Sequence, residues 1–282
     1  MPFSRVYLEI TNCCNLACSF CPGTTRRAAF LTVAQFTHLA GALRGQTRFL
    51  YFHVMGEPLL HPDLPELLDI AGRMGFRVVL TTNGTLLPKR QRELLAAQAL
   101  HKVSVSLHSF EANSGVDMEH YLAGCTDFGL AASEAGILID YRLWNLDGAE
   151  TRGRNEQNDA ILNHLHAAYP GNWTQNTWGW RLCDRTFIHY GEKFDWPSPD
   201  APDHGEAGTC RALRDQLAVL CDGTVVPCCL NGEGRIPLGN LLAQPLDEIL
   251  AAEPARSIAA GFALQKRLHP LCRRCGYAQR FR

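Results

Sequence analysis

The feature that most constrains the fold is a regular alternation of predicted strands and helices over residues 6–169. Strands and helices repeat about every 25–30 residues, the rhythm of a parallel sheet or barrel. Apolar and β-branched runs predict five strands, at Val6–Ile10, Phe49–Val54, Arg77–Thr82, Lys102–Leu107 and Ile137–Leu143. Amphipathic stretches predict the intervening helices, at Thr32–Leu43, Leu64–Met74, Pro88–Gln98, Met118–Ala135 and Asn155–Tyr169. We therefore expect an α/β fold, with a sixth strand within Thr177–Tyr190.

Composition excludes several broad classes of protein. Of 282 residues, 46% are hydrophobic and 20% charged, which is typical of a globular chain and excludes disorder. The net charge of −1 gives no overall basic field for nucleic acid or an anionic membrane. The amino-terminal sequence MPFSRVYLEI lacks the apolar core of a secretory signal, and no run is long enough to span a membrane. We expect a cytoplasmic protein without a membrane partner.

Twelve cysteines are many for such a chain. A reducing cytoplasm does not maintain disulfides, so clustered cysteines there more often bind metal or take part in redox chemistry. Ten of them form two groups, which predicts two metal sites, and Cys125 and Cys183 fall between the groups. One group comprises Cys13, Cys14, Cys18 and Cys21, and the other Cys210, Cys221, Cys228, Cys229, Cys272 and Cys275.

The first group follows the first predicted strand directly. Cys14, Cys18 and Cys21 therefore fall on a loop at the carboxyl end of a parallel strand, where such folds place active sites. Three thiolates are one short of the set that fully ligates a four-iron cluster, so one iron would stay open to a substrate or cofactor. A zinc site, or cysteines buried as small hydrophobic residues, are the alternatives.

The second group belongs to a separate carboxyl-terminal segment. We expect a barrel over residues 1–196, a linker rich in Pro, Asp and Gly over residues 197–209, and a small domain over residues 210–282. Asp222-Gly223 is a hairpin signal between two strands of this domain, and Leu246–Ala252 predicts a short helix. The hairpin would return Cys228 toward Cys210.

Together these motifs resemble the signature of the radical S-adenosylmethionine (SAM) superfamily. The cysteine triplet has the aromatic Phe20 just before its last member, and Met55-Gly56-Glu57-Pro58 is similar to the superfamily's Gly-Gly-Glu-Pro motif, with methionine in place of the first glycine. Thr81–Gly84 and Ser104–Leu107 match its third and fourth strands. The resemblance covers about residues 1–195 and implies a partial (β/α)6 barrel. It also implies a [4Fe–4S] cluster on Cys14, Cys18 and Cys21 that binds SAM.

SAM needs partners for its ammonium, ribose and carboxylate. Backbone carbonyls near Met55 and Gly56, together with the Glu57 carboxylate, are candidates for the ammonium. Asn83 and Ser106, at strand ends, are candidates for the ribose.

Arg142 lies in an apolar strand, where an unpaired cation is costly, so the SAM carboxylate is a reasonable partner. An internal salt bridge to Asp140 or Glu9 is the alternative. Phe20 is a candidate contact of the adenine. His53 and His108, at strand positions that face the barrel interior, are candidate catalytic residues, although satisfied polar side chains are the commoner case.

The carboxyl-terminal pattern resembles the twitch domain, the shortened relative of the SPASM domain of radical SAM enzymes. Twelve residues separate Cys210 from Gly223, four separate Gly223 from Cys228, and Cys272 pairs with Cys275. The resemblance implies one auxiliary [4Fe–4S] cluster on Cys210, Cys228, Cys272 and Cys275. A structural zinc on the same ligands, and Cys221 or Cys229 in place of an assigned ligand, remain open.

The combination implies a radical SAM oxidoreductase of the type of the aminocyclitol dehydrogenase of butirosin biosynthesis. It would cleave SAM reductively to a 5′-deoxyadenosyl radical and abstract a hydrogen atom from a substrate, with the auxiliary cluster accepting an electron. We expect a small-molecule substrate and a reducing donor such as flavodoxin or ferredoxin. A non-catalytic iron–sulfur or zinc protein, and an RNA- or peptide-modifying radical SAM enzyme, are the alternatives. For RNA, the basic runs Arg26-Arg27 and Lys89–Arg92 are short and are expected to be solvated surface.

All five tryptophans fall within residues 144–196. Either they close the open side of the barrel as core, which we expect, or they line a pocket for a ring or sugar.

Overall fold

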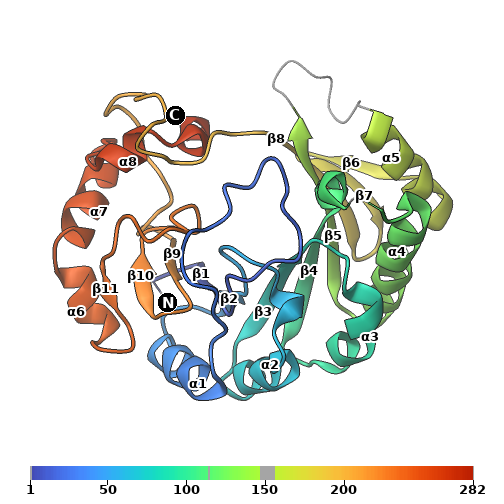
Figure 1. Ribbon diagram of the computed structural model, residues 1–282, viewed down its shortest axis with the longest axis horizontal. Coiled ribbons are helices and arrows are strands. Elements are labelled where there is room, and N and C mark those ends of the chain that lie inside the picture. The colour runs from blue at the N-terminus through green and yellow to red at the C-terminus, as the bar shows by residue number, and fades with distance from the viewer. Residues whose placement is uncertain (1, 114, 147–155, 282) are drawn as a thin grey trace.

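The computed structural model describes residues 2–113, 115–146 and 156–281, and its strands form one open, curved sheet (Figure 1). Strand order in the described part is β11-β10-β9-β1-β2-β3-β4-β5-β8-β7-β6. Six neighbouring strands run parallel, as expected for a partial barrel. They are β1 (Arg5–Leu8), β2 (Phe49–Tyr51), β3 (Arg77–Thr82), β4 (Leu100–Ser106), β5 (Leu138–Leu146) and β8 (Thr186–Glu192).

Helices cover the outer face of this sheet (Figure 1). They are α1 (Val33–Ala42), α2 (Leu64–Arg73), α3 (Leu87–Ala96), α4 (Met118–Glu134) and α5 (Glu156–Ala168). Each lies within three residues of its predicted bounds at both ends, except that Asn155, the expected start of α5, lies outside the described residues. Thr32 caps α1 through a capping box with Gln35, which explains why that helix begins there. The α/β class and the partial barrel are confirmed.

Alternation along the strands separates the two faces of the sheet. In β4, Val103 and Val105 are fully buried in the main apolar core, whereas Lys102 and Ser106 are half-buried on the opposite, concave face. The concave face therefore carries the polar side chains, which is where a barrel of this kind can hold ligands.

The region around Thr177–Tyr190, expected to hold a sixth strand, holds additional strands. Besides β8, a hairpin of β6 (Thr174–Asn176) and β7 (Gly179–Cys183) adds two antiparallel strands to that edge of the sheet. Gly179 sits so close to the Ile188 carbonyl oxygen that a Cβ there would lie 2.0 Å away. The hairpin is therefore packed tightly against β8.

The carboxyl-terminal strands extend the same sheet. β9 (Gln216–Val219) pairs in parallel with β1, and β10 (Thr224–Val226) pairs antiparallel with β9. The predicted turn holds Gly223 at φ +85°, a conformation that favours glycine. β11 (Gly239–Asn240), α6 (Leu246–Ala251), α7 (Ala255–Ala263) and α8 (Pro270–Arg273) follow. The division at residues 196 and 210 stays a proposal, and the two parts share one sheet.

Three short 3₁₀ helices complete the described elements: η1 (Pro58–Leu60), η2 (Leu107–Ala112) and η3 (Gly276–Arg280). Within the residues described, the helices are too short or too polar for any of them to traverse a lipid bilayer.

Removal of the carboxyl-terminal segment should destabilise the barrel. A chain that ends at Gly208 leaves the β1 edge over Arg5–Leu8 unpaired and exposes the face that Leu217 and Val219 bury. Because unpaired, flat strand edges promote association, we expect this truncated chain to elute as aggregates in size-exclusion chromatography. A monomeric truncated chain with the melting temperature of the full protein would contradict this view of the sheet.

Candidate functional site

The loop after β1 carries Cys14, Cys18 and Cys21 and crosses the open middle of the sheet, where Figure 1 draws it in dark blue. Cys14 and Cys21 are exposed and Cys18 is half-buried. The base of the loop is closed by an isolated bridge between Thr11 and Phe30. At this base Asn12 donates to the Arg27 carbonyl oxygen at 3.0 Å and accepts from the Ala29 N–H at 2.8 Å.

The thiols of this loop lie within electrostatic range of one another. Burial, together with the neighbouring thiols of Cys21 and Cys14, raises the pKa of Cys18 to about 12. Burial also raises the pKa of Cys14, with Glu57 and Cys21 as further causes. Without a metal these groups are neutral thiols, and a cationic cluster would favour the thiolates that ligate it. The donor set therefore fits an iron–sulfur cluster with one open iron.

Gly56 brings the Gly-Glu-Pro segment against the cysteine loop. Its φ is +78°, and a Cβ there would lie 2.6 Å from the Thr11 carbonyl oxygen and 2.8 Å from that of Cys13. The next residue, Glu57, donates its backbone N–H to the Cys13 carbonyl oxygen at 2.7 Å. Only glycine fits this close approach of two backbones.

The Glu57 carboxylate is occupied by backbone groups. It accepts from the Asn83 N–H at 2.7 Å and from the Leu59 N–H at 2.9 Å, and it is buried. Burial raises the pKa of Glu57 to about 7, against the effect of these hydrogen bonds. Glu57 thus joins two strand ends, so a role in positioning fits it better than direct contact with the SAM ammonium.

Asn83 links the end of β3 to the cysteine loop. Its amide nitrogen donates to Asn15 Oδ1 at 2.9 Å, and its Oδ1 accepts from the backbone and the hydroxyl of Thr85. Tyr121 donates its hydroxyl to the Asn83 carbonyl oxygen at 2.7 Å. The side chain is therefore largely committed to the loop, and Ser106, half-buried at the end of β4, is the freer candidate for the ribose.

Arg142 lies beside Ser106 on the concave face of the sheet. Burial lowers the pKa of Arg142, and its Nε is buried without a hydrogen-bond partner. Its guanidinium stacks 3.6 Å above the Trp144 ring. Among the described residues Arg142 makes no ion pair, so the internal salt bridge considered from the sequence is not formed. Asp140 pairs instead with Lys102 and His189, and Glu9 pairs with Arg26.

His53 and His108 both lie near Arg142, and both are neutral. Burial, together with the positive charge of Arg142, lowers the pKa of each to about 3. His108 Nδ1 lies 2.9 Å from the Arg142 carbonyl oxygen, and its ring packs 4.7 Å from Phe20. His53 Nδ1 is buried without a hydrogen-bond partner. Neutral imidazoles can donate or accept a hydrogen bond here, but they supply no charge.

Phe20 is held by Trp196, the last residue of the predicted barrel segment. The Trp196 indole N–H donates to the Phe20 carbonyl oxygen at 2.9 Å. The residue before Cys21 is therefore held between the His108 ring and the end of the barrel segment, next to the cysteine loop.

Four of the carboxyl-terminal cysteines gather behind β10. Burial raises the pKa of Cys228 well above its usual range, and Cys229, Cys210, Cys275 and Cys272 add to this effect. Burial raises the pKa of Cys272 to about 12, with Cys210 and Cys275 as the next causes. Cys210, Cys228, Cys272 and Cys275 therefore lie within electrostatic range of one another, and thiols are the ligand type of an all-thiolate metal or cluster site.

Cys221 and Cys229 also have partners outside this set. The Cys221 N–H donates to Glu9 Oε2 at 3.1 Å, and its sulfur lies 3.7 Å from Arg26 Nη1. Cys229 packs with Tyr7 on the concave side of the sheet. In the described part of the chain, no three His, Cys, Asp or Glu side chains are arranged to hold a single metal ion.

Glu9 is the residue at this site that sequence reasoning missed. Its fully buried carboxylate accepts from Arg26 at 2.7 Å and from the backbone N–H groups of Met55 and Cys221 at 3.1 Å each. Arg26 was expected on the solvated surface, but its side chain is only 16% exposed because it reaches this carboxylate. The signal was an acidic residue within the apolar strand predicted at Val6–Ile10.

Comparisons with known proteins agree with this geometry. Residues 8–124 match the radical SAM superfamily, and residues 210–276 match the SPASM iron–sulfur cluster-binding domain. A tungsten-containing aldehyde ferredoxin oxidoreductase cofactor-modifying protein of Pyrococcus furiosus is 30% identical over 146 residues, which cover 49% of this chain and 38% of that protein. The chain thus matches less than half the length of this curated relative.

Solved structures share the fold over nearly the whole chain. BtrN in complex with AdoMet and 2-DOIA superposes with a TM-score of 0.62 at 18% identity, covering 97% of this chain and 92% of that one. SuiB of Streptococcus suis bound to S-adenosylmethionine gives a TM-score of 0.64 at 15% identity, covering 98% and 72%. The chain therefore combines a radical SAM superfamily domain with a carboxyl-terminal iron–sulfur cluster-binding domain of the SPASM type.

Proposed function

We propose that this protein is a radical SAM enzyme in which Cys14, Cys18 and Cys21 hold a [4Fe–4S] cluster. When bound, the cluster and SAM supply a 5′-deoxyadenosyl radical that takes a hydrogen atom from the substrate. Support comes from the position of the loop, which Gly56 and Glu57 hold against the carboxyl ends of β1, β2 and β3. The chain itself binds and orients the cofactors.

The observation that carries the proposal is the unpaired Arg142 guanidinium beside Ser106. Arg142 is half-buried, and a cation partly removed from water without an ion pair is costly unless a ligand supplies the counter-charge. The SAM carboxylate is an anion that would do so, and the Ser106 hydroxyl is a donor or acceptor for the ribose next to it. The carbonyl groups of Met55 and Gly56 remain our candidates for the SAM ammonium. Phe20 remains our candidate contact for the adenine.

We assign Cys210, Cys228, Cys272 and Cys275 to an auxiliary [4Fe–4S] cluster. Four cysteine ligands leave no iron open, so this cluster is suited to accepting an electron rather than to binding substrate. The reaction we favour is the oxidation of a small molecule, with an external donor such as flavodoxin or ferredoxin. Relatives that include an AdoMet-dependent heme synthase, a PqqA peptide cyclase and several GTP 3′,8-cyclases keep cyclisation and peptide modification as further candidates.

The first cluster is tested by changing Cys14, Cys18 and Cys21 together to alanine. Anaerobically reconstituted wild-type protein should contain about eight irons per chain, from two four-iron clusters. The triple variant should lose about half of this iron and all 5′-deoxyadenosine formation with SAM and dithionite. Cys13→Ala is the matched control, because this neighbouring cysteine is not among our proposed ligands, and it should keep both clusters. SAM cleavage by the triple variant would contradict the proposal.

The auxiliary site is tested by the double change of Cys272 and Cys275 to alanine. We expect loss of the second cluster with retention of the first, because the two ligand sets lie on different segments. Loss of a metal site costs several kcal/mol and can unfold a small domain, so solubility and first-cluster iron are measured in parallel. An eight-iron double variant would show that Cys221 or Cys229 is a ligand. One zinc ion per wild-type chain would show that the site holds a structural zinc and not an auxiliary cluster.

A further inference from the structure

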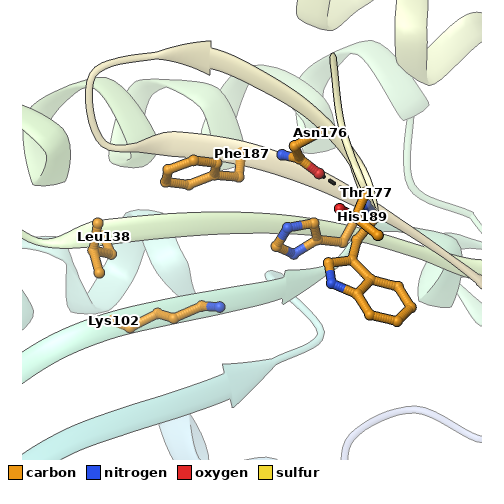
Figure 2. A pocket seen from close by; sticks show the side chains of 7 residues that line it. Lys102, Leu138, Asn176, Thr177, Phe187 and His189 are labelled. Atoms are coloured by element: carbon orange, nitrogen blue, oxygen red, sulfur yellow. Dashed lines mark hydrogen bonds between the residues drawn. The ribbon is translucent and has the colours of Figure 1, made fainter. Parts of the chain in front are cut away.

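A cavity on the concave face of the sheet is not used by the proposed cofactor sites. It has a volume of about 290 Å³, and its walls come from β4, β5, β8 and the turn between β6 and β7. Figure 2 shows Lys102, Leu138 and His189 on neighbouring strands around one space. The lining residues are Lys102, Leu138, Asn176, Thr177, Trp178, Phe187 and His189.

The cavity adjoins the proposed SAM site. Leu138, Asp140 and Arg142 alternate along β5 and therefore share its concave face. In the register of the sheet His189 is the direct neighbour of Arg142. The cavity therefore shares a face with the Arg142 guanidinium and runs from His189, beside Arg142, to Leu138, four residues back along β5.

One wall of the cavity is aromatic and held in place. The Phe187 and His189 rings are nearly parallel, at 18°, with centroids 6.2 Å apart. Trp178 is 70% exposed, which is unusual for so large an apolar side chain. Its backbone is fixed by hydrogen bonds to Asn176 Oδ1 and from the Tyr190 N–H, each 2.9 Å long. An indole on a rigid turn is a suitable surface for stacking against a flat ring.

The other wall holds a lysine and a histidine that share one carboxylate. Lys102 Nζ lies 2.8 Å from Asp140 Oδ2, and His189 Nδ1 lies 2.5 Å from Asp140 Oδ1. This single carboxylate therefore orients both polar groups of the wall. Its pKa is lowered because the contacts with His189 and Lys102 outweigh the effect of burial.

Further cations gather at the amino ends of the strands beside Lys102. Burial lowers the pKa of His101, and Arg77, Arg48, Lys102 and Arg185 lower it further by their positive charge. In a chain of net charge −1 this is a local positive field. Such a field attracts an anionic ligand to the mouth of the cavity.

We propose that this cavity is the substrate site, and that it takes a planar ring that carries a carboxylate or phosphate group. The ring lies against Trp178 and Phe187, and the anionic group reaches Lys102, whose ammonium has donors beyond the one on Asp140. This inference rests on the proposed function for the reaction at the ring, but the binding site itself does not. It concerns Trp178 alone, because Trp173 and Trp180 pack against the apolar core as expected.

The test is isothermal titration calorimetry of the full-length, cluster-reconstituted protein with two matched pairs of probes. The pairs are benzoate with benzyl alcohol, and guanosine 5′-monophosphate with guanosine. We expect the anionic member of at least one pair to bind on the order of tenfold more tightly than its neutral partner. The preferred pair distinguishes a carboxylate from a phosphate. Equal binding within both pairs would overturn the proposal.

Variants locate the binding. Trp178→Ala should weaken the binding of the preferred probe on the order of tenfold, because a stacking contact is lost. Its exposed indole is not part of the core, so folding is not at risk. Lys102→Gln should reduce the preference for the anionic probe. The matched controls Leu264→Ala, at a 73% exposed residue, and Lys89→Gln, at an exposed residue of α3, should bind as wild type.

Wild-type affinity in Trp178→Ala would overturn the location of the site. Formation of 5′-deoxyadenosine by the same wild-type preparation is measured separately. If no 5′-deoxyadenosine forms, the proposed function is contradicted. The probe comparisons would still decide whether the cavity binds a planar anionic ligand.

Discussion

The buried carboxylate of Glu9 is the interaction on which the arrangement of the site depends. A carboxylate with no exposed surface is stable only when it is paired and its oxygens are hydrogen-bonded. Here its three partners come from three segments: Arg26 of the cysteine loop, the N–H of Met55 after β2, and the N–H of Cys221 after β9. Separation of any one segment would leave a buried charge incompletely satisfied. The loop, the Gly-Glu-Pro segment and the carboxyl-terminal hairpin are therefore held together by one group.

Other contacts reinforce the same junction. A Cβ at Gly232 would lie 2.6 Å from Met55 Cγ, so this methionine packs against the carboxyl-terminal segment. The methionine is the one departure from the superfamily's Gly-Gly-Glu-Pro motif, and its side chain has a packing role that glycine could not fill. Thr25 of the cysteine loop donates its hydroxyl to Glu233 at 2.6 Å. The two groups of cysteines, far apart in sequence, thus belong to segments that share contacts.

Local patterns predicted the parts of the fold whose causes are local. The strand–helix alternation, the Thr32 cap and the Gly223 turn each depend on residues close in sequence, and the structure has all three. Spacing likewise predicted which cysteines form groups. The pairing of β9 with β1 and the contact of Glu9 with Cys221 were not predictable, since the latter joins residues 212 positions apart. A single sequence carries no local signal for such pairings.

The same limit applies to the concave face. The sequence placed Arg142 and Asp140 on one strand and left open an ion pair between them. In the structure Asp140 pairs instead with Lys102 and His189 of the neighbouring strands. The β6–β7 hairpin has short strands without a clear alternation, so its turn and the exposed Trp178 became apparent only in the structure. The candidate substrate site was therefore hidden, whereas the candidate cofactor site was visible in the motifs.

The measurement that tests this account most directly is the stability and iron content of Glu9→Gln. Loss of the charge leaves Arg26 unpaired and turns one acceptor oxygen into a donor facing N–H groups. We expect destabilisation of about 3–5 kcal/mol and reduced iron in the first cluster. Glu111→Gln is the control, because this exposed carboxylate accepts from Ser19 of the same loop and should change stability by less than about 0.5 kcal/mol. A Glu9→Gln protein with wild-type melting temperature and full iron content would contradict the account.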